Sequence, residues 1–514
     1  MSNRFLLFSM VLSPMLSMGQ PSDSVEVRVF GSEGMDEAMA VWSDVSGYVL
    51  AGETTSDITM ADGQAIWAPG GPVGLKGFIT VLDSELEFVW SFAFASDPGA
   101  PLGTPSTLAV RDVVRTPGST VWVLYDAPRE GRWQGHLLGV HPEGGIVQEF
   151  DVLSGGTVST CALLPAGPGN YLLVGHRQAD YLPSSIPSGV MAGLWQGDAQ
   201  EPPGWAFVEG TEGMKPVDAA WWGGRLYVAV HREGQEDAPA AVIVVGTDNG
   251  VPQVIGMAQI ADPDLVLTGI TAAQEGAAWS GTVASADGTL DAAYGKLAAE
   301  PDSLDPDTWS HDWIVVTESA EDRPGRCILW TGDVLQCAGR TTTEGAGGSG
   351  AMVQRRFGPN GAWFGVHIFG GEGDEDVRDM ARDGAGRLVV VGSSDSWTEL
   401  TGGSGSRDAV LFRASSINLT PSFSYGEPQV VVDGAAVFVG MEEFSATDRR
   451  QAMSIQAGTP MPVEPGSAWV LYDIGGKRVA QGEGPAPMPD LPGWTRLETG
   501  TDGHPGGRWL WVRR

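Results

Sequence analysis

The sequence is poor in cysteine and in basic residues. Three cysteines in 514 residues exclude a scaffold built on disulfides. Lys and Arg number 30 against 64 Asp and Glu, which gives a formal net charge of −34. Such an acidic chain is not expected to bind nucleic-acid phosphates or an anionic membrane surface. Beyond the N-terminus no apolar run approaches the roughly 20 residues of a membrane-spanning helix, so no span is predicted in the mature chain.

The seven histidines also lack a metal-binding arrangement. They form no HExxH motif, and His136 and His141 have the wrong parity to share one face of a strand. The sequence pattern therefore predicts neither a zinc site nor a nonheme iron site.

Glycine and proline, by contrast, are abundant. The chain contains 73 Gly and 34 Pro, about a fifth of its residues, while apolar residues still account for 42 %. This composition is typical of a folded protein with many turns, since a disordered chain has few apolar residues. Apolar positions alternate and helical periodicity is absent, so an all-β fold is predicted.

One phrase occurs twice, 339 positions apart. Residues 27–57 read VRVFGSEGMDEAMAVWSDVSGYVLAGETTSD, and residues 366–396 read VHIFGGEGDEDVRDMARDGAGRLVVVGSSDS. Its hairpin with a glycine turn recurs along the chain, beginning near residues 38, 110, 159, 216, 267, 326 and 377. The mean interval of 56.5 residues is close to the repeat of a four-stranded propeller blade.

The strand count explains why the phrase is repeated. Seven hairpins are followed by seven third strands but only six fourth strands. The missing strand is VEVRVFG, residues 25–31, which precedes the first hairpin and can pair with RDAVLFR, residues 407–413. That pairing would close the ring and remove the open sheet edge. We therefore predict a seven-bladed β-propeller over residues 25–416, closed by its N-terminal strand.

The two copies of the phrase resemble a known family. FGSEGMDEA and FGGEGDEDV, each followed by an apolar strand with a glycine near its end, are similar to the β-propeller repeat common in exported bacterial proteins. The similarity is good in the first, sixth and seventh blades, and it implies a propeller in an exported protein.

Residues 1–19 have the features of a secretory signal peptide. Arg4 supplies the positive charge, residues 5–16 form a short apolar segment, and Ser17-Met18-Gly19 is a small-x-small cleavage site. The segment is too short to span a membrane. We therefore expect an exported, soluble mature protein.

The end of the chain is predicted to be a separate unit. Residues 417–427 form a Pro-bearing linker, and residues 428–514 are expected to form a small β-sandwich. Its segment WVLYDIGGKRV resembles the hairpin of the C-terminal sorting domain of the type IX secretion system of the Bacteroidota. The resemblance rests on Tyr472, Asp473, Gly475, Gly476 and Lys477.

That resemblance implies that residues 428–514 are an export address bound by the secretion machinery. The protein would then pass through the periplasm to the outer-membrane surface or the medium. The alternative is an ordinary β-sandwich with a common Asp-Gly turn.

No catalytic motif accompanies the predicted propeller. The chain has no GxSxG elbow, no Walker loop and no dinucleotide fingerprint. It also lacks the Ser-x-Asp-x-Gly-x-x-Trp boxes of sialidase propellers. With 64 acidic residues, pairs of carboxylates for acid–base catalysis stay open, but we assign no catalytic residue.

The densest acidic cluster lies in the second copy of the phrase and comprises Glu372, Asp374, Glu375, Asp376 and Asp379. Glu372, Asp374 and Asp376 alternate on a Gly-rich loop and could bind Ca²⁺ through their oxygens. The alternative is that one carboxylate per blade caps backbone N–H groups of the turn between blades. The repetition of the motif favours this second interpretation, and no other cofactor is predicted.

Two of the cysteines, Cys327 and Cys337, lie on the two strands of one predicted hairpin. A three-residue loop would place them opposite each other and allow a disulfide. A two-residue loop would shift them by one position and point them to opposite faces. Both alternatives are open from the sequence.

These features predict an exported, monomeric binding or surface protein with a glycan or a protein as ligand. One alternative is a secreted polysaccharide hydrolase or lyase that uses carboxylates at the channel mouth, and another is a scaffold for partner proteins. Two acids and an aromatic residue converging at the mouth would favour the enzyme. Trp221 and Trp222 are the most conspicuous candidates for stacking on a sugar, although neighbours on a strand face opposite sides.

Overall fold

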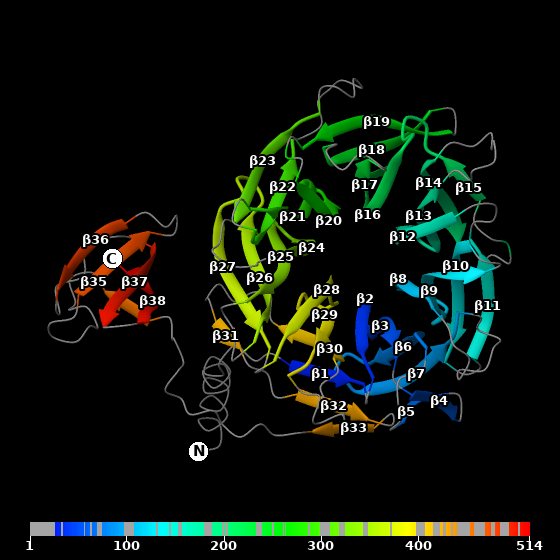
Figure 1. Ribbon diagram of the computed structural model, residues 1–514, viewed down its shortest axis with the longest axis horizontal. Coiled ribbons are helices and arrows are strands. Elements are labelled where there is room, and N and C mark those ends of the chain that lie inside the picture. Colours follow the sequence, from blue (N-terminus) through cyan, green and yellow to red (C-terminus); the bar gives the residue numbers. More distant parts are fainter. Residues whose placement is uncertain are drawn as a thin grey trace, which may run out of the picture.

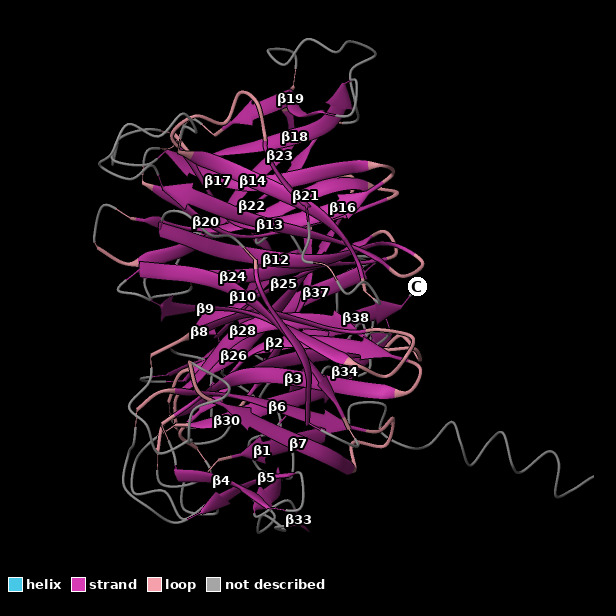
Figure 2. Ribbon diagram, turned by 90° about the vertical axis from the view of Figure 1, so that its right-hand side faces the viewer, coloured by secondary structure: helices cyan, strands magenta, loops and turns pink. Residues whose placement is uncertain are grey.

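The computed structural model of the chain is all-β, and its described residues contain no helix (Figure 2). That part of the chain accordingly has no helix with the length and apolar character needed to cross a membrane. The described residues, with side chains only as far as residue 414, are 26–31, 34–55, 57–61, 64–68, 74–96, 107–129, 132–142, 145–152, 157–178, 188–197, 201, 204–232, 239–248, 251–260, 262, 264–285, 288–298, 309–317, 324–342, 348–370, 373–396, 407–414, 422–424, 428–432, 435–438, 453–456, 468–473, 478–483, 493–501 and 504–513.

Seven four-stranded blades surround a common centre (Figure 1). Within each blade the strands follow chain order from the centre outward, except that the outermost strand of blade 7 is the N-terminal strand. The predicted seven-bladed β-propeller is confirmed.

The strand bounds are as follows. Blade 1 contains β2 (Asp36–Asp44), β3 (Gly47–Thr54), β6 (Lys76–Leu82) and β7 (Phe88–Phe94), with the hairpin β4 (Asp57–Ala61) and β5 (Gln64–Ala68) inserted after β3. Blade 2 contains β8 (Ala109–Arg115), β9 (Val121–Arg129), β10 (Arg132–His141) and β11 (Gly145–Asp151). Blade 3 contains β12 (Thr157–Gly167), β13 (Asn170–Gln178), β14 (Gly189–Gln196) and β15 (Gly204–Phe207).

The remaining blades have the same plan. Blade 4 contains β16 (Met214–Trp222), β17 (Arg225–Arg232), β18 (Ala241–Asp248) and β19 (Val251–Gln259). Blade 5 contains β20 (Leu265–Ala273), β21 (Gly276–Ala284), β22 (Leu290–Leu297) and β23 (His311–Thr317). Blade 6 contains β24 (Gly325–Thr331), β25 (Val334–Thr341), β26 (Gly350–Phe357) and β27 (Trp363–Phe369). Blade 7 contains β28 (Glu375–Arg382), β29 (Leu388–Ser394), β30 (Asp408–Ala414) and β1 (Glu26–Phe30).

The hydrophobic core is divided among the junctions between blades. Each pair of neighbouring blades encloses its own cluster of buried side chains. Third strands such as β6 and β30 are buried along their whole length, whereas the outermost strand β23 alternates between partly buried and exposed positions. This gradient explains why third strands are nearly continuous apolar runs in the sequence, while outer strands alternate.

The N-terminal strand closes the ring as predicted. β1 pairs antiparallel with β30, from Glu26 opposite Arg413 to Phe30 opposite Ala409. The Arg413 guanidinium, which is 2 % exposed, pairs with Glu26 and also donates to the backbone carbonyl of Ser84 in blade 1. The N-terminal strand is therefore fastened both to its own blade and to the next one.

The repeated phrase also has a steric cause. A Cβ atom at Gly31 would collide with the carboxylate of Asp36, and one at Gly370 would collide with the carboxylate of Glu375. In both copies the carboxylate lies five residues after the glycine, where the chain crosses into the next inner strand, β2 or β28. The two copies are alike because each builds the same crossing, in which a buried acid packs on a bare backbone.

Two segments outside the predicted propeller pair with it. β31 (Ser422–Ser424), within the predicted linker, pairs in parallel with β27 of blade 6. Residues 428–438, at the start of the predicted C-terminal unit, form the hairpin of β32 (Pro428–Val432) and β33 (Ala435–Phe438), and β32 pairs with β1 and extends the sheet of blade 7. The sequence did not predict this partner, because pairing to a distant edge leaves no local signal.

The final strands form a separate five-stranded sheet. Its members are β34 (Met453–Gln456), β35 (Ala468–Asp473), β36 (Arg478–Glu483), β37 (Gly493–Thr501) and β38 (His504–Arg513). β35 and β36 are the two strands of the hairpin that resembles the sorting domain. Tyr472 and Asp473 end β35, whereas residues 474–477, and with them Gly475, Gly476 and Lys477, lie outside the described residues.

The hairpin that carries two of the cysteines has the two-residue turn. Thr331 lies opposite Val334, so Ile328 and not Cys327 is opposite Cys337. Cys337 is buried between blades 5 and 6, and Cys327 packs against the cluster between blades 6 and 7. Both thiols are free. The disulfide alternative for Cys327 and Cys337 is therefore not realised, because the shorter turn points them to opposite faces of the blade.

Candidate functional site: the channel mouth

All seven inner strands have a β-bulge near their start. The register skips one residue in each, and these residues are Met39, Arg111, Cys161, Val217, Thr268, Arg326 and Arg378. We call the residue after each bulge the collar position. The collar residues, from blade 1 to blade 7, are Ala40, Asp112, Ala162, Asp218, Gly269, Cys327 and Asp379. A bulge changes the direction of the side chains beside it. The collar positions are therefore the places where the inner strands depart from regular alternation.

The three collar aspartates each join two blades. The Asp112 carboxylate accepts the backbone N–H of Val113 in its own strand at 2.7 Å and that of Leu163 in blade 3 at 2.7 Å. Asp218 accepts in the same way from Ala219 at 2.8 Å and from Ile270 in blade 5 at 2.8 Å. Asp379 accepts from Met380 at 2.7 Å and from Val41 in blade 1 at 2.9 Å.

The blades that receive these bonds have a small collar residue. Val41, Leu163 and Ile270 directly follow Ala40, Ala162 and Gly269. A second aspartate there would bring two carboxylates against one backbone N–H group, which like-charge repulsion disfavours. This explains why acidic and small collar residues alternate around most of the ring.

The collar carboxyls bind protons unusually tightly. Burial raises the pKa of Asp379 to about 6, and burial together with the charge of Asp379 raises the pKa of Asp218 to about 7. Burial and the same neighbours raise the pKa of Asp112 well above its usual range. The three side chains are half-buried. Desolvation is the leading cause of the raised pKa in each of them.

A second tier of contacts lies just above the collar. In blades 1, 2 and 4, an equivalent residue of the second strand accepts a hydrogen bond from the first residues of the next inner strand. The Glu53 carboxylate accepts from Val110 N–H at 2.8 Å, and the Asp126 carboxylate accepts from Thr160 N–H at 2.9 Å. In blade 4 the equivalent residue is His231, whose Nε2 accepts from Leu267 N–H at 3.0 Å.

Ion pairs run through this tier on one side of the ring. Arg326 of blade 6 pairs with Asp376 of blade 7 at 3.2 Å, and Arg378 lies 3.6 Å from the same carboxylate. Arg378 also pairs with Glu37 of blade 1 at 2.6 Å. Farther along, Arg111 pairs with Asp126 at 2.8 Å. We call this side, from blade 6 through blades 7, 1 and 2 to blade 3, the acidic arc, because carboxylates join every pair of blades in it.

In this tier the junctions on the other side use uncharged groups, although the collar residue Asp218 also joins blades 4 and 5. Blades 4 and 5 are joined by His231, and blades 5 and 6 by the hydroxyl of Thr282, which donates to the Gly325 carbonyl at 3.1 Å. We call the junctions from blade 4 to blade 6 the neutral arc. Burial lowers the pKa of His231, so its imidazole stays neutral and can accept a hydrogen bond.

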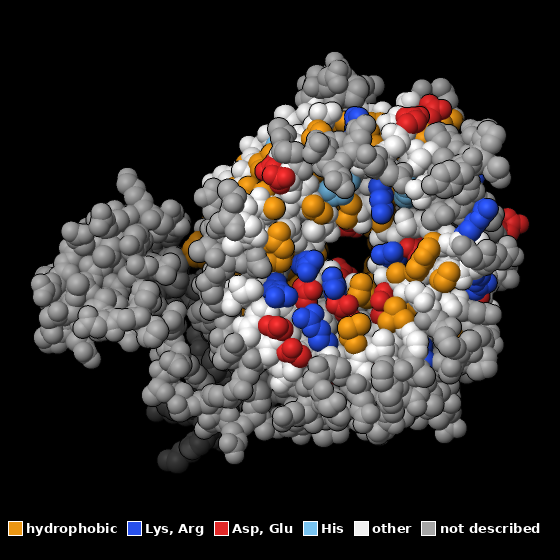
Figure 3. Space-filling view, in the orientation of Figure 1, with side chains coloured by type: hydrophobic (Ala, Val, Ile, Leu, Met, Phe, Trp, Pro, Cys, Tyr) orange, Lys and Arg blue, Asp and Glu red, His pale blue; other side chains and the backbone are white. Residues whose placement is uncertain are grey.

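The mouth of the channel is open. Figure 3 shows a hole at the centre of the ring, with basic and acidic side chains side by side around it where β24, β28 and β2 lie. The side chains of Arg111, Arg326 and Arg378 are 38 %, 32 % and 31 % exposed. Their guanidinium groups are therefore tied to carboxylates but still reach solvent at the mouth.

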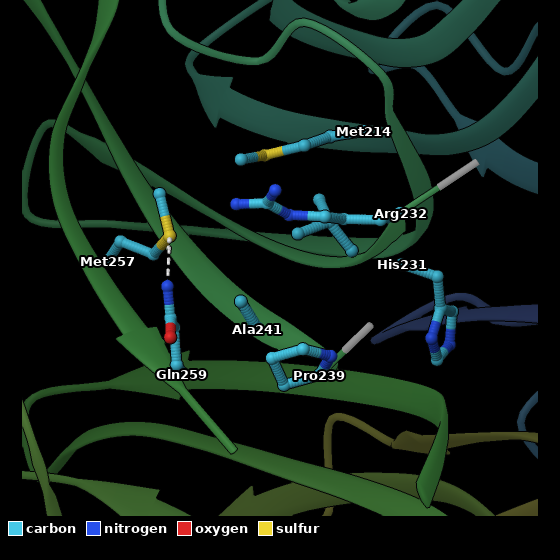
Figure 4. Close-up of a pocket in the computed structure, with 8 residues that line it drawn as sticks. Met214, His231, Arg232, Pro239, Ala241, Met257 and Gln259 are labelled. Atoms are coloured by element: carbon cyan, nitrogen blue, oxygen red, sulfur yellow. Dashed lines mark hydrogen bonds between the residues drawn. The ribbon is translucent and has the colours of Figure 1, made fainter. Parts of the chain in front are cut away.

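A small pocket lies at the edge of blade 4 (Figure 4). Its lining includes Met214, His231, Arg232, Ala241 and Met257 (Figure 4), and His231 Nε2 also accepts from Leu267 of the next blade. The empty volume of about 230 Å³ includes open solvent. The pocket is thus a shallow surface hollow. The channel mouth has more charged and hydrogen-bonding side chains than this pocket.

The predicted Ca²⁺ ligands are engaged elsewhere. The Asp374 carboxylate accepts from the backbone N–H of Ser349 at 2.8 Å and from its hydroxyl at 2.6 Å. Asp376 faces Arg326 and Arg378 as described above, and Glu372 lies outside the described residues. The contacts of Asp374 correspond to the alternative interpretation, in which a carboxylate caps the turn between blades.

The two neighbouring tryptophans, Trp221 and Trp222, face opposite sides of their strand, as adjacent strand residues do. Trp221 packs against the core between blades 3 and 4, and Trp222 is 48 % exposed. Both lie at the far end of β16 from Met214, so neither belongs to the bulged end of the strand. Among the described residues, no aromatic side chain joins the carboxylates of the two tiers.

Sequence reasoning did not predict the common role of the collar aspartates, although a signal was present. VRDVV, PVDAA and VRDMA begin three of the seven hairpins with an apolar residue two positions before an aspartate. In a regular strand, residues two positions apart lie on the same face. An aspartate two positions after a buried apolar residue therefore interrupts the row of apolar side chains on that face. The partners of these acids, backbone N–H groups one blade away, cannot be recognised from residue types.

Comparisons with known proteins give only general similarity. No family model matches the chain, and no curated protein matches it. Among solved structures, the chain is similar to a puromycin-hydrolyzing peptidase of Mycobacterium tuberculosis, with 13 % identity, a TM-score of 0.34 and coverage of 70 % of this chain and 58 % of that one. The aligned part thus spans little more than half of that peptidase.

Two further similar structures come from a sialidase and a viral ectodomain. A mutant of the NanB sialidase of Streptococcus pneumoniae has 7 % identity and a TM-score of 0.36, with coverage of 75 % of this chain and 68 % of that one. The hemagglutinin-neuraminidase ectodomain of parainfluenza virus 5 has 9 % identity and a TM-score of 0.39, with coverage of 78 % and 85 %. At these values no residue or activity is transferred to this chain.

Proposed function

We propose that this protein is an exported binding protein that holds a neutral, hydroxyl-rich ligand of the carbohydrate class at the mouth of its propeller channel. The observation that carries this proposal is the acidic arc. There, half-exposed guanidinium groups and carboxylates lie side by side at an open mouth. Such a surface offers hydrogen-bond donors and acceptors together, which is what sugar hydroxyls require.

The charges of the arc favour a neutral ligand over an anionic one. Arg326 and Arg378 share Asp376, and Arg378 also pairs with Glu37. The charge of these arginines is therefore already balanced by carboxylates. An anionic ligand would find no free positive charge there, while a neutral polyol needs none.

The proposal is tested on the full chain with a glycan array. Wild-type protein should retain a defined set of glycans, and the double variant Arg326→Ala/Arg378→Ala should lose them. Arg232→Ala is the matched control, since Arg232 is an exposed arginine on the neutral side of the ring. Retention of the same glycans by the double variant, or of none by the wild type, contradicts the proposal.

A second candidate function is a polysaccharide hydrolase or lyase, and one observation favours it. The raised pKa values of Asp218 and Asp379, about 7 and about 6, suit general acid–base catalysis near neutral pH. Against it, each of these carboxylates already accepts two backbone N–H groups. Release of reducing ends from polysaccharides by the wild type, lost in Asp218→Asn and Asp379→Asn, would support the enzyme instead.

The export route belongs to the same proposal. It rests on the signal-peptide features of residues 1–19 and on the sorting-domain resemblance around Tyr472 and Asp473. Because β32 and β33 extend blade 7, the portable unit should begin after them. Fusion of residues 453–514 to an unrelated periplasmic protein should carry it to the cell surface or the medium. A fusion that stays in the periplasm overturns the sorting role and leaves the binding role intact.

A further inference from the structure

A cluster of three potential metal ligands lies on the outer strands of blade 2, apart from the channel mouth. His136 on β10 is directly opposite Asp151 on β11, and Glu149 lies two residues earlier on β11. Side chains two apart share one face of a strand. The antiparallel register therefore brings one imidazole and two carboxylates together.

The spacing of these groups suits a tetrahedral ion. His136 Nδ1 lies 3.0 Å from the Asp151 carboxylate and 3.7 Å from the Glu149 carboxylate. One ligand atom from each residue lies within 4.8 Å of both others. A zinc ion with bonds of about 2.0–2.1 Å separates its ligand atoms by roughly 3.3 Å, which is between the two measured distances. Small side-chain rotations would complete the geometry.

The imidazole faces the two carboxylates from a buried position. The His136 side chain is fully buried, and its Nδ1 is the ring atom that lies toward both Asp151 and Glu149. A buried imidazole beside two carboxylates is a ligand set that divalent metal ions accept.

The surrounding residues would orient the ligands and control access. The Tyr125 hydroxyl donates to the Glu149 carboxylate at 2.8 Å, and its ring stacks on His136 with centroids 5.0 Å apart. Arg129 pairs with Glu149 and lies 3.8 Å from Asp151. Its side chain is 29 % exposed, so it can turn to solvent when a cation takes its place. Asp151, 55 % exposed, provides the route of entry.

We propose that His136, Glu149 and Asp151 bind a zinc ion, with water as the fourth ligand. Nitrogen and carboxylate ligands suit zinc, and three protein ligands leave one position open. The site is independent of the ligand proposed for the channel mouth. It also explains why histidine spacing within the sequence did not reveal it, since two of its three ligands are carboxylates on the next strand.

The test is titration of the full chain with zinc chloride by isothermal calorimetry, after treatment with a chelator. Wild-type protein should bind one zinc ion at this site. Asp151→Asn and Glu149→Gln should each weaken that binding roughly 100-fold, and Tyr125→Phe roughly tenfold, as expected for a residue that orients a ligand. Glu85→Gln, which removes an exposed acid from blade 1, is the matched control and should bind like the wild type.

Two further measurements separate the site from general attraction of zinc to an acidic surface. Cobalt should give the strong visible absorption of a tetrahedral complex in the wild type and lose it in His136→Phe, which keeps a ring against Tyr125. Arg129→Ala should bind zinc several-fold more tightly, since a competing cation is gone. Equal affinity and stoichiometry in the wild type, Asp151→Asn and Glu149→Gln, or a weak octahedral cobalt spectrum, would overturn the proposal.

Discussion

The junction between blades 2 and 3 and the junction between blades 4 and 5 share one backbone plan but use different chemistry. In both, a collar aspartate accepts an N–H just after the next bulge, from Leu163 or Ile270. In both, a residue of the second strand accepts an N–H just before that bulge. That residue is Asp126 in the first junction and His231 in the second.

The difference shows that at these two junctions the second-strand residue acts as an acceptor, and that this role does not require a charge. Asp126 is 1 % exposed and needs Arg111 beside it, whereas the neutral His231 ring needs no counter-ion. A buried carboxylate must be balanced by charge and hydrogen bonds. The charged solution thus adds an arginine that reaches the mouth, and the neutral solution does not.

The largest effect is expected from removing the charged acceptor. Asp126→Ala leaves the Thr160 N–H, the Thr160 hydroxyl and Arg111 without this carboxylate, so we expect a loss of about 3 kcal/mol in the free energy of unfolding. His231→Ala removes one acceptor and should cost about 1 kcal/mol. Urea denaturation of both variants measures the difference, and equal losses would mean that charge plays no part.

A smaller and equal effect is expected at the collar. Asp112→Ala and Asp218→Ala each remove a carboxylate that accepts two backbone N–H groups. Water in the channel can replace part of these bonds, so each variant should lose about 1–2 kcal/mol. Thermal unfolding measures the effect in both. A loss of stability in one variant and none in the other would show that the two collar aspartates do not have the same structural role.

The pH dependence should sharpen the comparison within the junction of blades 4 and 5. Burial raises the pKa of Asp218 to about 7, against about 3.9 in the unfolded chain. The folded state therefore keeps a proton that the unfolded state releases between about pH 4 and 7. The stability that Asp218 contributes is fully present below pH 4 and is lost as the pH rises to about 7. His231, with a lowered pKa, contributes stability that is lost as the pH falls below about 6.5.

Variants separate these opposite trends. The difference in unfolding free energy between wild type and Asp218→Asn should shrink as the pH rises from 4 to 7, and that between wild type and His231→Gln should grow. Urea denaturation at several pH values measures both differences. A constant difference across this range in Asp218→Asn would contradict the protonated collar.

The smallest effect is expected at the junction of blades 6 and 7, where Cys327 occupies the collar position. Burial raises the pKa of Cys327 well above its usual range, and its thiol is free. A reductant should therefore leave the melting temperature unchanged within about 1 °C, and thiol titration in denaturant should find all three cysteines. Recovery of Cys327 and Cys337 as one linked peptide would restore the disulfide alternative.

The sequence was sufficient for the ring and insufficient for its mouth. The glycine turns and alternating strands predicted the blades, and the early VEVRVFG strand predicted closure, because these are local patterns with a fixed period. The turn at Gly332 and Asp333 stayed undecided, since a loop length of two or three residues follows from packing around it. The shared role of Asp112, Asp218 and Asp379 was not predicted, because their partners are backbone groups one blade away. The cluster of His136, Glu149 and Asp151 depends on register between strands, which spacing along the chain does not report.

Ring closure has a consequence for the order of folding. Glu26 meets Arg413, 387 residues later, so the first strand of the chain has no partner until almost the whole propeller has been made. Closing so long a loop carries a high entropic cost, and contacts of this separation form late. Blades 1 to 6 can assemble one after another as the chain emerges, but blade 7 must wait with an unpaired edge on β30. The last step of folding is thus the pairing of the N-terminal strand β1 with β30. A slow step there would leave the edge of β30 unpaired for longer, and an unpaired strand edge promotes aggregation.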